Sequence, residues 1–180
     1  MDQFINIINL SLSREYCDNL IEFCENIYNE NNEIITLKMY DNNNWKKYIK
    51  EIKSEIKKNV INYIKEIDIN NIFLSEKNIS NLNFELPILK KYRKDIGKLC
   101  YKKKNIYDIG KKKISFLTFI WFLNDNEDKD GGEIEFFGYY KIKPEKGKLI
   151  IFPSEIFFPY SIKLSSKDNY ILTTELYIDL

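Results

Sequence analysis

Residues 113–153 read KISFLTFIWFLNDNEDKDGGEIEFFGYYKIKPEKGKLIIFP, and this stretch decides the expected fold. It contains three short runs rich in β-branched and aromatic residues, separated by glycine, proline and acidic residues. Such runs predict β-strands, and the glycine and proline positions predict the turns between them. The same texture begins at Phe84 and continues to the end of the chain, so we expect residues 81–180 to form a sandwich or barrel.

The first 80 residues show helical periodicity instead. A long helix is expected from Trp45 to about Ile67, where apolar residues recur at intervals of three and four between Lys and Glu. A shorter helix is expected after Ser13, a suitable N-cap residue, and should continue to about Tyr28. Its apolar face consists of Cys17, Leu20, Ile21, Cys24, Ile27 and Tyr28.

Two short strands should accompany these helices. Phe4–Leu10 is an apolar run that suits a strand, and residues 33–40, EIITLKMY, have a strand-like composition. We therefore expect residues 1–80 to supply a strand and helices that brace one sheet of the β-rich part. The 180 residues should form a single domain, because a chain of this length buries enough surface to be stable without disulfide or metal staples.

The composition is nearly neutral, with 28 basic and 27 acidic residues, and it contains no histidine. The absence of histidine excludes Ser-His-Asp and Cys-His catalytic relays, Cys/His zinc fingers, and iron or zinc sites built on imidazole. The 26 Lys against two Arg, the 21 Asn and the absence of Ala indicate an A+T-rich genome, such as that of a large DNA virus or a protozoan. Histidine also has an A+T-rich codon, so codon bias explains its absence less well.

The three cysteines, Cys17, Cys24 and Cys100, lack metal-ligand spacing and indicate buried free thiols in a reducing compartment. The longest apolar run, Ile114–Leu123, is about half the length that spans a bilayer, and the N-terminus lacks the basic region of a signal peptide. We therefore expect an intracellular protein, in the cytoplasm, the nucleus or a virion, with no membrane partner.

The order of signals in the second half resembles the prolyl 4-hydroxylase-like iron(II)/2-oxoglutarate dioxygenases. Members of that family read Y-x-x-G with a following H-x-D, then a strand ending Y-L-N, then G-G-E-x-x-F, P-x-x-G-x-x-x-x-F and H-x-V. The corresponding segments here are Tyr92 with Gly97, LTFIWFLND at 117–125, GGEIEF at 131–136, IKPEKGKLIIFP at 142–153 and FPYSIKL at 158–164.

The N-terminal residues FINIINLSLSREYCDNLIEF also look like that family's opening strand and helix, so the resemblance covers nearly the whole chain. It implies an α+β fold, in which a double-stranded β-helix, a barrel of the jelly-roll or cupin type, is braced by N-terminal helices.

The resemblance also implies where a metal site would lie. In the family, two imidazoles and one carboxylate bind iron(II). Laying KLCYKKKN on the H-x-D strand puts Lys102 at the first histidine and Lys104 at the carboxylate, and the distal histidine falls on Tyr160. Two cations would repel iron, and a lysine ligates only when deprotonated.

The family also places a basic residue on the far carboxylate of 2-oxoglutarate. That position falls on Asn169, or on Lys167 if the alignment slips by two residues. Phe122 stands where several members carry a tyrosine for 2-oxoglutarate. Without that slip, this sequence thus has a different residue from the one that the family uses at all of the implied metal and cofactor positions.

These substitutions imply a retained fold without its iron chemistry, that is, a pseudoenzyme. We expect no catalytic residue, no metal and no cofactor, and a binding or structural role with a protein or peptide partner in the former substrate groove. The alternative is an active 2-oxoglutarate-dependent hydroxylase with an unconventional metal site, with iron(II) and 2-oxoglutarate as cofactors; a shifted alignment would bring Asp108 to the carboxylate position. If Lys102 and Lys104 face the interior, the pocket would instead suit a carboxylate or phosphate.

A second alternative comes from the basic stretch between Lys90 and Lys113. It holds eleven Lys or Arg and two Asp, with tyrosines interleaved, a composition that can follow a nucleic-acid backbone and stack bases. The competing interpretation is a solvated strand edge. The residues of this candidate patch are Lys98, Lys102, Lys103, Lys104, Lys111, Lys112 and Lys113.

Overall fold

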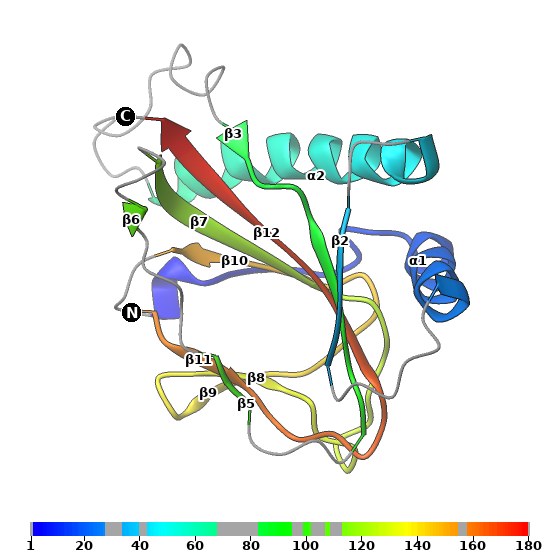
Figure 1. The fold of residues 1–180 in the computed structure, drawn as a ribbon. Helices are drawn as coiled ribbons and strands as arrows, with labels where there is room; N and C mark the ends of the chain where they lie inside the picture. The colour runs from blue at the N-terminus through cyan, green and yellow to red at the C-terminus, as the bar shows by residue number, and fades with distance from the viewer. Residues whose placement is uncertain are drawn as a thin grey trace.

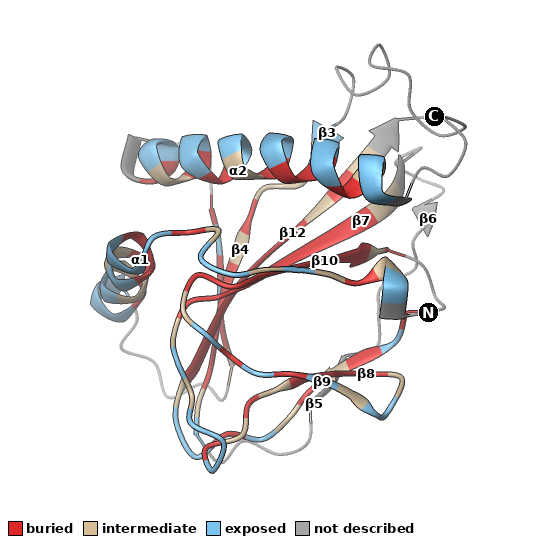
Figure 2. Ribbon diagram, turned by 180° about the vertical axis from the view of Figure 1, so that it is seen from behind, coloured by how far each residue is buried: buried red, intermediate tan, exposed pale blue. Residues whose placement is uncertain are grey.

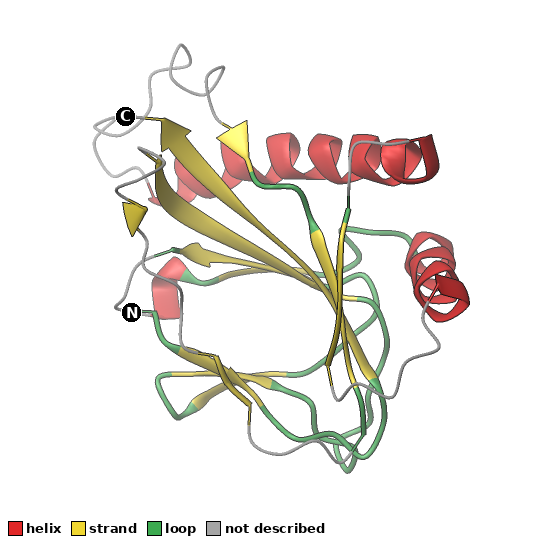
Figure 3. Ribbon diagram, in the orientation of Figure 1, coloured by secondary structure: helices red, strands yellow, loops and turns green. Residues whose placement is uncertain are grey.

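The computed structural model describes most of the chain as two antiparallel sheets and two helices (Figure 3). The described residues are 2–27, 34–39, 43–67, 83–94, 99–101, 107–108, 113–154 and 158–179. Both helices lie on the outer side of the larger sheet, and the smaller sheet faces the opposite side of it (Figure 1).

The larger sheet follows the order β1-β10-β7-β12-β4-β2, with β3 pairing with β12 and β6 pairing with β7. Every strand pair in it is antiparallel. Its strands are β1 (Asn6–Ile8), β10 (Leu149–Pro153), β7 (Lys113–Phe122), β12 (Asn169–Asp179), β4 (Ile88–Tyr92), β2 (Ile34–Lys38), β3 (Asn83–Phe84) and β6 (Tyr107–Asp108).

The smaller sheet follows the order β5-β11-β8-β9, also antiparallel throughout. Its strands are β5 (Leu99–Tyr101), β11 (Tyr160–Ile162), β8 (Ile134–Phe136) and β9 (Tyr140–Ile142). Two facing antiparallel sheets braced by helices confirm the expected α+β architecture.

The helices begin close to the positions that the sequence predicts. Helix α1 (Arg14–Ile27) is capped by Ser13, whose Oγ accepts a hydrogen bond from the Tyr16 backbone N–H at 3.1 Å. Helix α2 (Asn43–Ile67) is the long amphipathic helix. Aromatic side chains join the two helices, with the Phe23 and Trp45 rings 4.4 Å apart.

Two local expectations are wrong. Ile27 is 49% exposed rather than buried, because α1 ends there and no further turn holds it against the sheet. The run Phe4–Leu10 is not one strand: a 3-10 helix (Asp2–Phe4) precedes β1, and Leu10 has a φ of 53° in the turn that follows. That left-handed backbone cannot continue a strand.

The larger sheet carries a core on each face, as the alternation along β7 shows. Phe119 and Trp121 pack toward the helices, whereas Ile120 and Phe122 pack toward the smaller sheet. All four side chains are fully buried, and most of β7 has the buried colour in Figure 2. Alternation with period two therefore divides one hydrophobic strand between an outer core under the helices and an inner core between the sheets.

Cys17 and Cys24 are free cysteines on the buried face of α1. Both are 0% exposed and belong to the outer core. Leu20 lies between them in sequence and is also completely buried. The expectation of buried free cysteines is confirmed for these two, while the side chain of Cys100 lies outside the described residues.

Among the described residues, neither helix combines the length and the apolar character that crossing a membrane requires.

Candidate functional site in the barrel interior

The inner core lies between the two sheets, and aromatic side chains from both sheets meet in it. The rings of Phe136 on β8 and Phe152 on β10 have centroids 4.8 Å apart, and the ring of Tyr160 on β11 lies 5.4 Å from Phe152 and 5.7 Å from Phe136. The other buried members are Ile5, Tyr92, Ile120, Phe122, Ile134, Ile142, Ile150, Phe158, Ile162 and Ile171. The described part of the barrel interior is therefore a packed hydrophobic core.

Tyr160, the residue aligned with the distal histidine, is part of this core. It pairs with Tyr101 of β5 and Phe136 of β8, and only 9% of it is exposed. Burial raises the pKa of its phenol well above the usual value, and the nearby Tyr92 and Glu175 raise it further. The Tyr160 side chain is therefore a neutral phenol at physiological pH.

Tyr92, the tyrosine of the motif that precedes the H-x-D strand, faces the same core from the end of β4. It is 3% exposed, and its Oη has no hydrogen-bond partner among the described residues. Burial raises the pKa of this phenol as well. A buried hydroxyl without a partner costs free energy, and few are found in native proteins.

Asn169, aligned with the 2-oxoglutarate-binding basic residue, begins β12 opposite Tyr92 and is 1% exposed. Its Nδ2 donates to the Gly132 carbonyl at 3.0 Å, and its Oδ1 accepts from Asn126 Nδ2 at 3.3 Å. Gly132 has a φ of +84°, and a Cβ there would lie 2.4 Å from Asn169 Nδ2. The Gly-Gly sequence thus allows the β7–β8 loop to approach the Asn169 amide closely.

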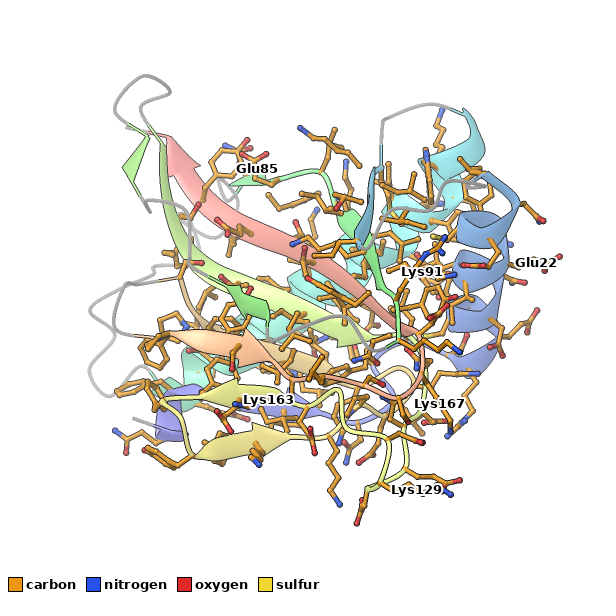
Figure 4. All side chains as sticks on the ribbon, turned by 60° about the horizontal axis from the view of Figure 1, so that its bottom comes forward. Glu22, Glu85, Lys91, Lys129, Lys163 and Lys167 are labelled. Atoms are coloured by element: carbon orange, nitrogen blue, oxygen red, sulfur yellow. The ribbon has the colours of Figure 1, made fainter. Side chains whose placement is uncertain are left out.

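Lys167, the alternative basic position, points to that loop rather than to the core. Its Nζ lies 2.6 Å from Asp130 Oδ2, and its side chain is 52% exposed. The hydrogen bond from Lys167 lowers the pKa of Asp130 to about 2. Figure 4 shows Lys167 among the loops at the end of the barrel, near Lys129.

Phe122, the third residue aligned with 2-oxoglutarate binding, is fully buried in the inner core. It pairs with Ile171 of β12 in the sheet register. Its phenyl ring offers no hydrogen-bonding group.

The residues aligned with the first two iron ligands, Lys102 and Lys104, lie outside the described residues, as do Lys98, Lys103, Lys111 and Lys112. Lys113 begins β7, where it pairs with Asp179 and with Asp108, but its side chain is not described. Within the described residues no group of three Cys, Asp or Glu side chains is placed to hold a metal ion.

The start of the basic stretch, on β4, is buried rather than exposed. Lys91 is 6% exposed, and its Nζ lies 2.8 Å from Glu25 and 3.0 Å from Asp168, over the ring of Tyr170. Figure 4 shows Lys91 beside α1. Burial opposes its charge, but hydrogen bonds with Glu25, Asp168 and Tyr170 outweigh burial and raise its pKa. Lys90, on the opposite face of the strand, is 8% exposed. These two lysines do not form a surface for nucleic acid.

Sequence reasoning did not find two features of the interior. Glu175 on β12 lies close enough to Tyr160 to raise its pKa, and Lys90 is buried on the inner side of β4. Strand alternation from Tyr92 and Ile171 would have placed both residues on the inner face.

The architecture has close counterparts among solved structures. The viral collagen prolyl hydroxylase of Paramecium bursaria chlorella virus 1, in complex with 2-oxoglutarate, superposes with a TM-score of 0.73, covering 98% of this chain and 97% of that chain at 18% identity. The fold is that of the prolyl 4-hydroxylases. A prolyl 4-hydroxylase from Pseudomonas putida (TM-score 0.64, 13% identity) matches 98% of this chain and 94% of its own.

A third prolyl hydroxylase of this fold, from Trichoplax adhaerens, was solved in complex with a peptide of the oxygen degradation domain of hypoxia inducible factor. The match covers 97% of this chain and 84% of that chain, with a TM-score of 0.66 and 15% identity. No protein-family model matches the chain, and no curated protein matches it in sequence.

The described residues at the aligned positions do not fit the iron and 2-oxoglutarate of a prolyl 4-hydroxylase. A phenol whose pKa is raised stays protonated and is a poor iron ligand at Tyr160. The Asn169 amide is neutral, and both of its ends are engaged in hydrogen bonds. Phe122 has no polar group to offer a carboxylate.

Proposed function

We propose that this chain is a catalytically inactive relative of the prolyl 4-hydroxylases that acts as a binding or structural module. The observation that carries the proposal is the pair Tyr160 and Asn169. Tyr160 is a neutral buried phenol at the position that the sequence alignment assigns to an iron ligand, and Asn169 is an amide at the position that it assigns to a cation. A chain without histidine has no imidazole to offer at either histidine position.

The packing of the inner core supports the same proposal. Phe136 and Phe152 are fully buried and their rings pack edge to face, with Tyr160 against both. Aromatic pairs in such contact stabilise a core beyond the area that they bury. The barrel is therefore stabilised by side chains, without any need for a bound metal or cofactor.

The partner that we infer is an extended, proline-containing segment of another protein. The support is by analogy of fold: the Trichoplax neighbour holds a peptide, and the viral neighbour is a collagen prolyl hydroxylase. A module that keeps the shape of such an enzyme can keep peptide recognition after its chemistry is lost, because fold and site chemistry are separable.

The catalytic half of the proposal is tested with iron(II) and 2-oxoglutarate. The protein is equilibrated with both under anaerobic conditions, bound metal is measured, and oxygen is then supplied while succinate is followed. We expect neither stoichiometric iron nor succinate above a protein-free control, with the chlorella virus enzyme as the positive control. Stoichiometric iron together with succinate release would overturn the proposal and establish the active hydroxylase with unconventional ligands.

A restored variant tests the alignment behind the proposal. It combines Lys102→His, Lys104→Asp, Tyr160→His and Asn169→Arg. Regained iron binding, measured by the same anaerobic assay, would support the alignment. A folded variant that binds no more iron than the natural chain would count against it.

The binding half is tested by fluorescence anisotropy with a labelled collagen-like peptide, and the matched control replaces each proline by alanine. We expect saturable binding of the proline peptide that neither a chelator nor 2-oxoglutarate alters. Equal binding of the two peptides, or binding that requires iron, would contradict the proposal.

A further inference from the structure

The outward face of helix α2 is rich in lysine. The helix contains seven lysines and three glutamates, and all seven lysines are exposed. Figure 2 shows this exposed face running along the helix, away from the sheet. The lysines are Lys46, Lys47, Lys50, Lys53, Lys57, Lys58 and Lys65.

Four of these lysines form one stripe. Lys46, Lys50, Lys53 and Lys57 are spaced by four, three and four residues, which places them on the same side of a helix with 3.6 residues per turn. At a rise of about 1.5 Å per residue, the stripe extends over roughly 16 Å. Lys53 also lies over the Phe84 ring, 5.1 Å from its centroid, which places the stripe on the β3 side of the helix.

The glutamates of α2 occupy the opposite flank, toward α1 and the N-terminal segment. Glu55 accepts a hydrogen bond from Ser11 Oγ at 3.0 Å, and Glu66 accepts one from Asn6 Nδ2 at 2.5 Å. Burial raises the pKa of the Tyr16 phenol on α1, and the nearby Glu51 raises it further. The negative charges of the helix therefore do not neutralise the lysine stripe.

The lysines of α2 also differ from other lysines in their pairing. Outside α2, eight described lysines lie within 4.0 Å of a carboxylate oxygen: Lys91, Lys129, Lys141, Lys143, Lys146, Lys148, Lys163 and Lys167. On α2, only Lys58 has such a partner within the part of the chain that the structure describes, Glu55 at 3.5 Å. The basic face is thus largely uncompensated.

The near-neutral total charge conceals this separation. Helix α1 carries one basic residue, Arg14, against Glu15, Asp18, Glu22 and Glu25, whereas α2 has seven Lys against three Glu. An excess of lysine spread over the whole surface by codon bias alone would not leave one helix acidic and its neighbour basic. A surface of one sign attracts ligands of the opposite sign.

We propose that the outward face of α2 binds the phosphate backbone of a nucleic acid. A strand of duplex DNA presents a phosphate about every 3.4 Å along the axis, so the stripe can follow roughly five phosphates. A membrane surface fits less well. The apolar side of α2, including Ile49, Ile52 and Ile56, is buried in the outer core. Among the described side chains of the helix, the exposed large apolar residue is Ile61, at 38%. Helices that bind in a membrane interface need a free apolar face.

The test is fluorescence anisotropy of the full chain with a labelled 20-nucleotide single strand and its duplex, from 50 to 200 mM NaCl. The test variant is K46Q/K50Q/K57Q, which removes three charges from the stripe and keeps good helix formers. We expect the natural chain to bind in the micromolar range at low salt, and the variant to bind at least tenfold more weakly. The slope of log K against log salt should fall by about 2 to 3, near 0.7–0.9 for each phosphate that the variant no longer neutralises.

The matched control, K129Q/K141Q/K143Q, removes three exposed, carboxylate-paired lysines elsewhere. It should leave the affinity within about twofold of the natural chain, because a carboxylate already lies within 4.0 Å of each of these lysines. Absence of binding at 50 mM NaCl, or equal losses in both variants, would overturn the proposal. Tighter binding to phosphatidylserine vesicles, or equal binding to polyglutamate of the same charge, would overturn it in favour of a membrane or an acidic protein. All these outcomes are independent of what the barrel interior binds.

Discussion

Buried tyrosine hydroxyls of the outer core differ in hydrogen bonding from the Tyr92 hydroxyl of the inner core. On the outer face, Tyr16 Oη donates to the Tyr48 carbonyl and Tyr63 Oη donates to the Phe4 carbonyl, both at 2.8 Å. Lys91 on that face is held by Glu25 and Asp168. On the inner face, Tyr92 Oη is buried with no hydrogen-bond partner in the described part of the chain.

This difference agrees with the proposed function, in which the inner face is a former site. A protein that needs only a stable core gains nothing from an unpartnered hydroxyl, and a phenylalanine would pack there at less cost. Tyr92 belongs to the motif that resembles the dioxygenases, as does Tyr160 in the same core. Under the proposed function, hydrophobic residues have filled a former site on the inner face, and four experiments test how the two faces differ.

The largest expected effect comes from neighbouring residues on opposite faces. Trp121→Ala removes a fully buried ring from the outer core, and Phe122→Ala removes one from the inner core. Each should lower the free energy of unfolding by about 3–5 kcal/mol, because both leave a cavity in packed surroundings. Urea unfolding measures both values. If Phe122→Ala costs much less than Trp121→Ala, the inner face borders open space and the comparison fails.

A smaller effect is expected at the loop that contacts Asn169. Gly132→Ala forces a Cβ to within 2.4 Å of Asn169 Nδ2, whereas Gly138→Ala, at a similar φ of +81°, meets no described atom within 4 Å. Both variants incur the strain of a left-handed backbone, about 1–3 kcal/mol. Thermal unfolding should show the greater loss for Gly132→Ala, since only that loop must also move away from β12. Equal losses would mean that the Asn169 contact is unimportant.

The ionic cluster of the outer face should contribute about 1–3 kcal/mol, the range for hydrogen bonds of buried charged groups. Lys91→Met keeps the length of the side chain but removes its charge, leaving Glu25 and Asp168 partly exposed to water. Urea unfolding at pH 7 should show this loss. An unchanged stability would place the cluster among those buried ion pairs that hydrophobic residues replace without cost.

The same variant has a predicted pH dependence. Burial opposes the charge of Asp168, but the Lys94 backbone N–H and Lys91 outweigh burial and lower its pKa below the ordinary 3.8. Its contribution is therefore present above pH 3.8 and is lost as the pH falls through the folded pKa. The pKa of Lys91 is raised above 10.5, so its contribution is present below that pH and lost in strong alkali. The difference between the natural chain and Lys91→Met should be constant near neutrality and shrink at both extremes.

The smallest effect compares two buried phenols. Tyr16→Phe loses the hydrogen bond to Tyr48 and should cost about 0.5–1.5 kcal/mol. Tyr92→Phe loses a hydroxyl that has no partner among the described residues, so it should leave the free energy of unfolding unchanged or raise it slightly. If Tyr92→Phe lowered the free energy of unfolding as much as Tyr16→Phe, the Tyr92 hydroxyl would have a hydrogen-bond partner in solution. The two faces would then not differ in this respect.

The sequence predicts most of the fold because the relevant signals are local. Periodicity and the Ser13 cap predict α1 and α2, and alternation along β7 divides its side chains between the two cores. The exceptions, Ile27 and Leu10, lie where an element ends and the path of the chain decides exposure. The sequence pattern alone does not determine where a helix or strand ends, or whether the residue at its end is buried.

The position of the candidate site stays a prediction from the motif order, and its interactions could not be predicted from the sequence. The motif order led to Tyr160 and Asn169, yet Asn169 bonds to Gly132 and Asn126, 37 and 43 residues away in the chain. Likewise, the basic stretch from Lys90 predicts an exposed surface, because its charge count contains no information on Glu25, 66 residues from Lys91. The lysine spacing on α2 was present in the sequence, but the structure was needed to show how differently the lysines of α2 and those elsewhere are paired.

The two thiols beneath α1 make the docking of that helix measurable. Burial raises the pKa of Cys17 to about 12 and that of Cys24 to about 11. Since only the thiolate attacks alkylating reagents, both residues should react slowly while the helix lies on the sheet. The rate at which these thiols are alkylated near neutral pH therefore measures how often α1 detaches from the sheet, and no engineered label is needed.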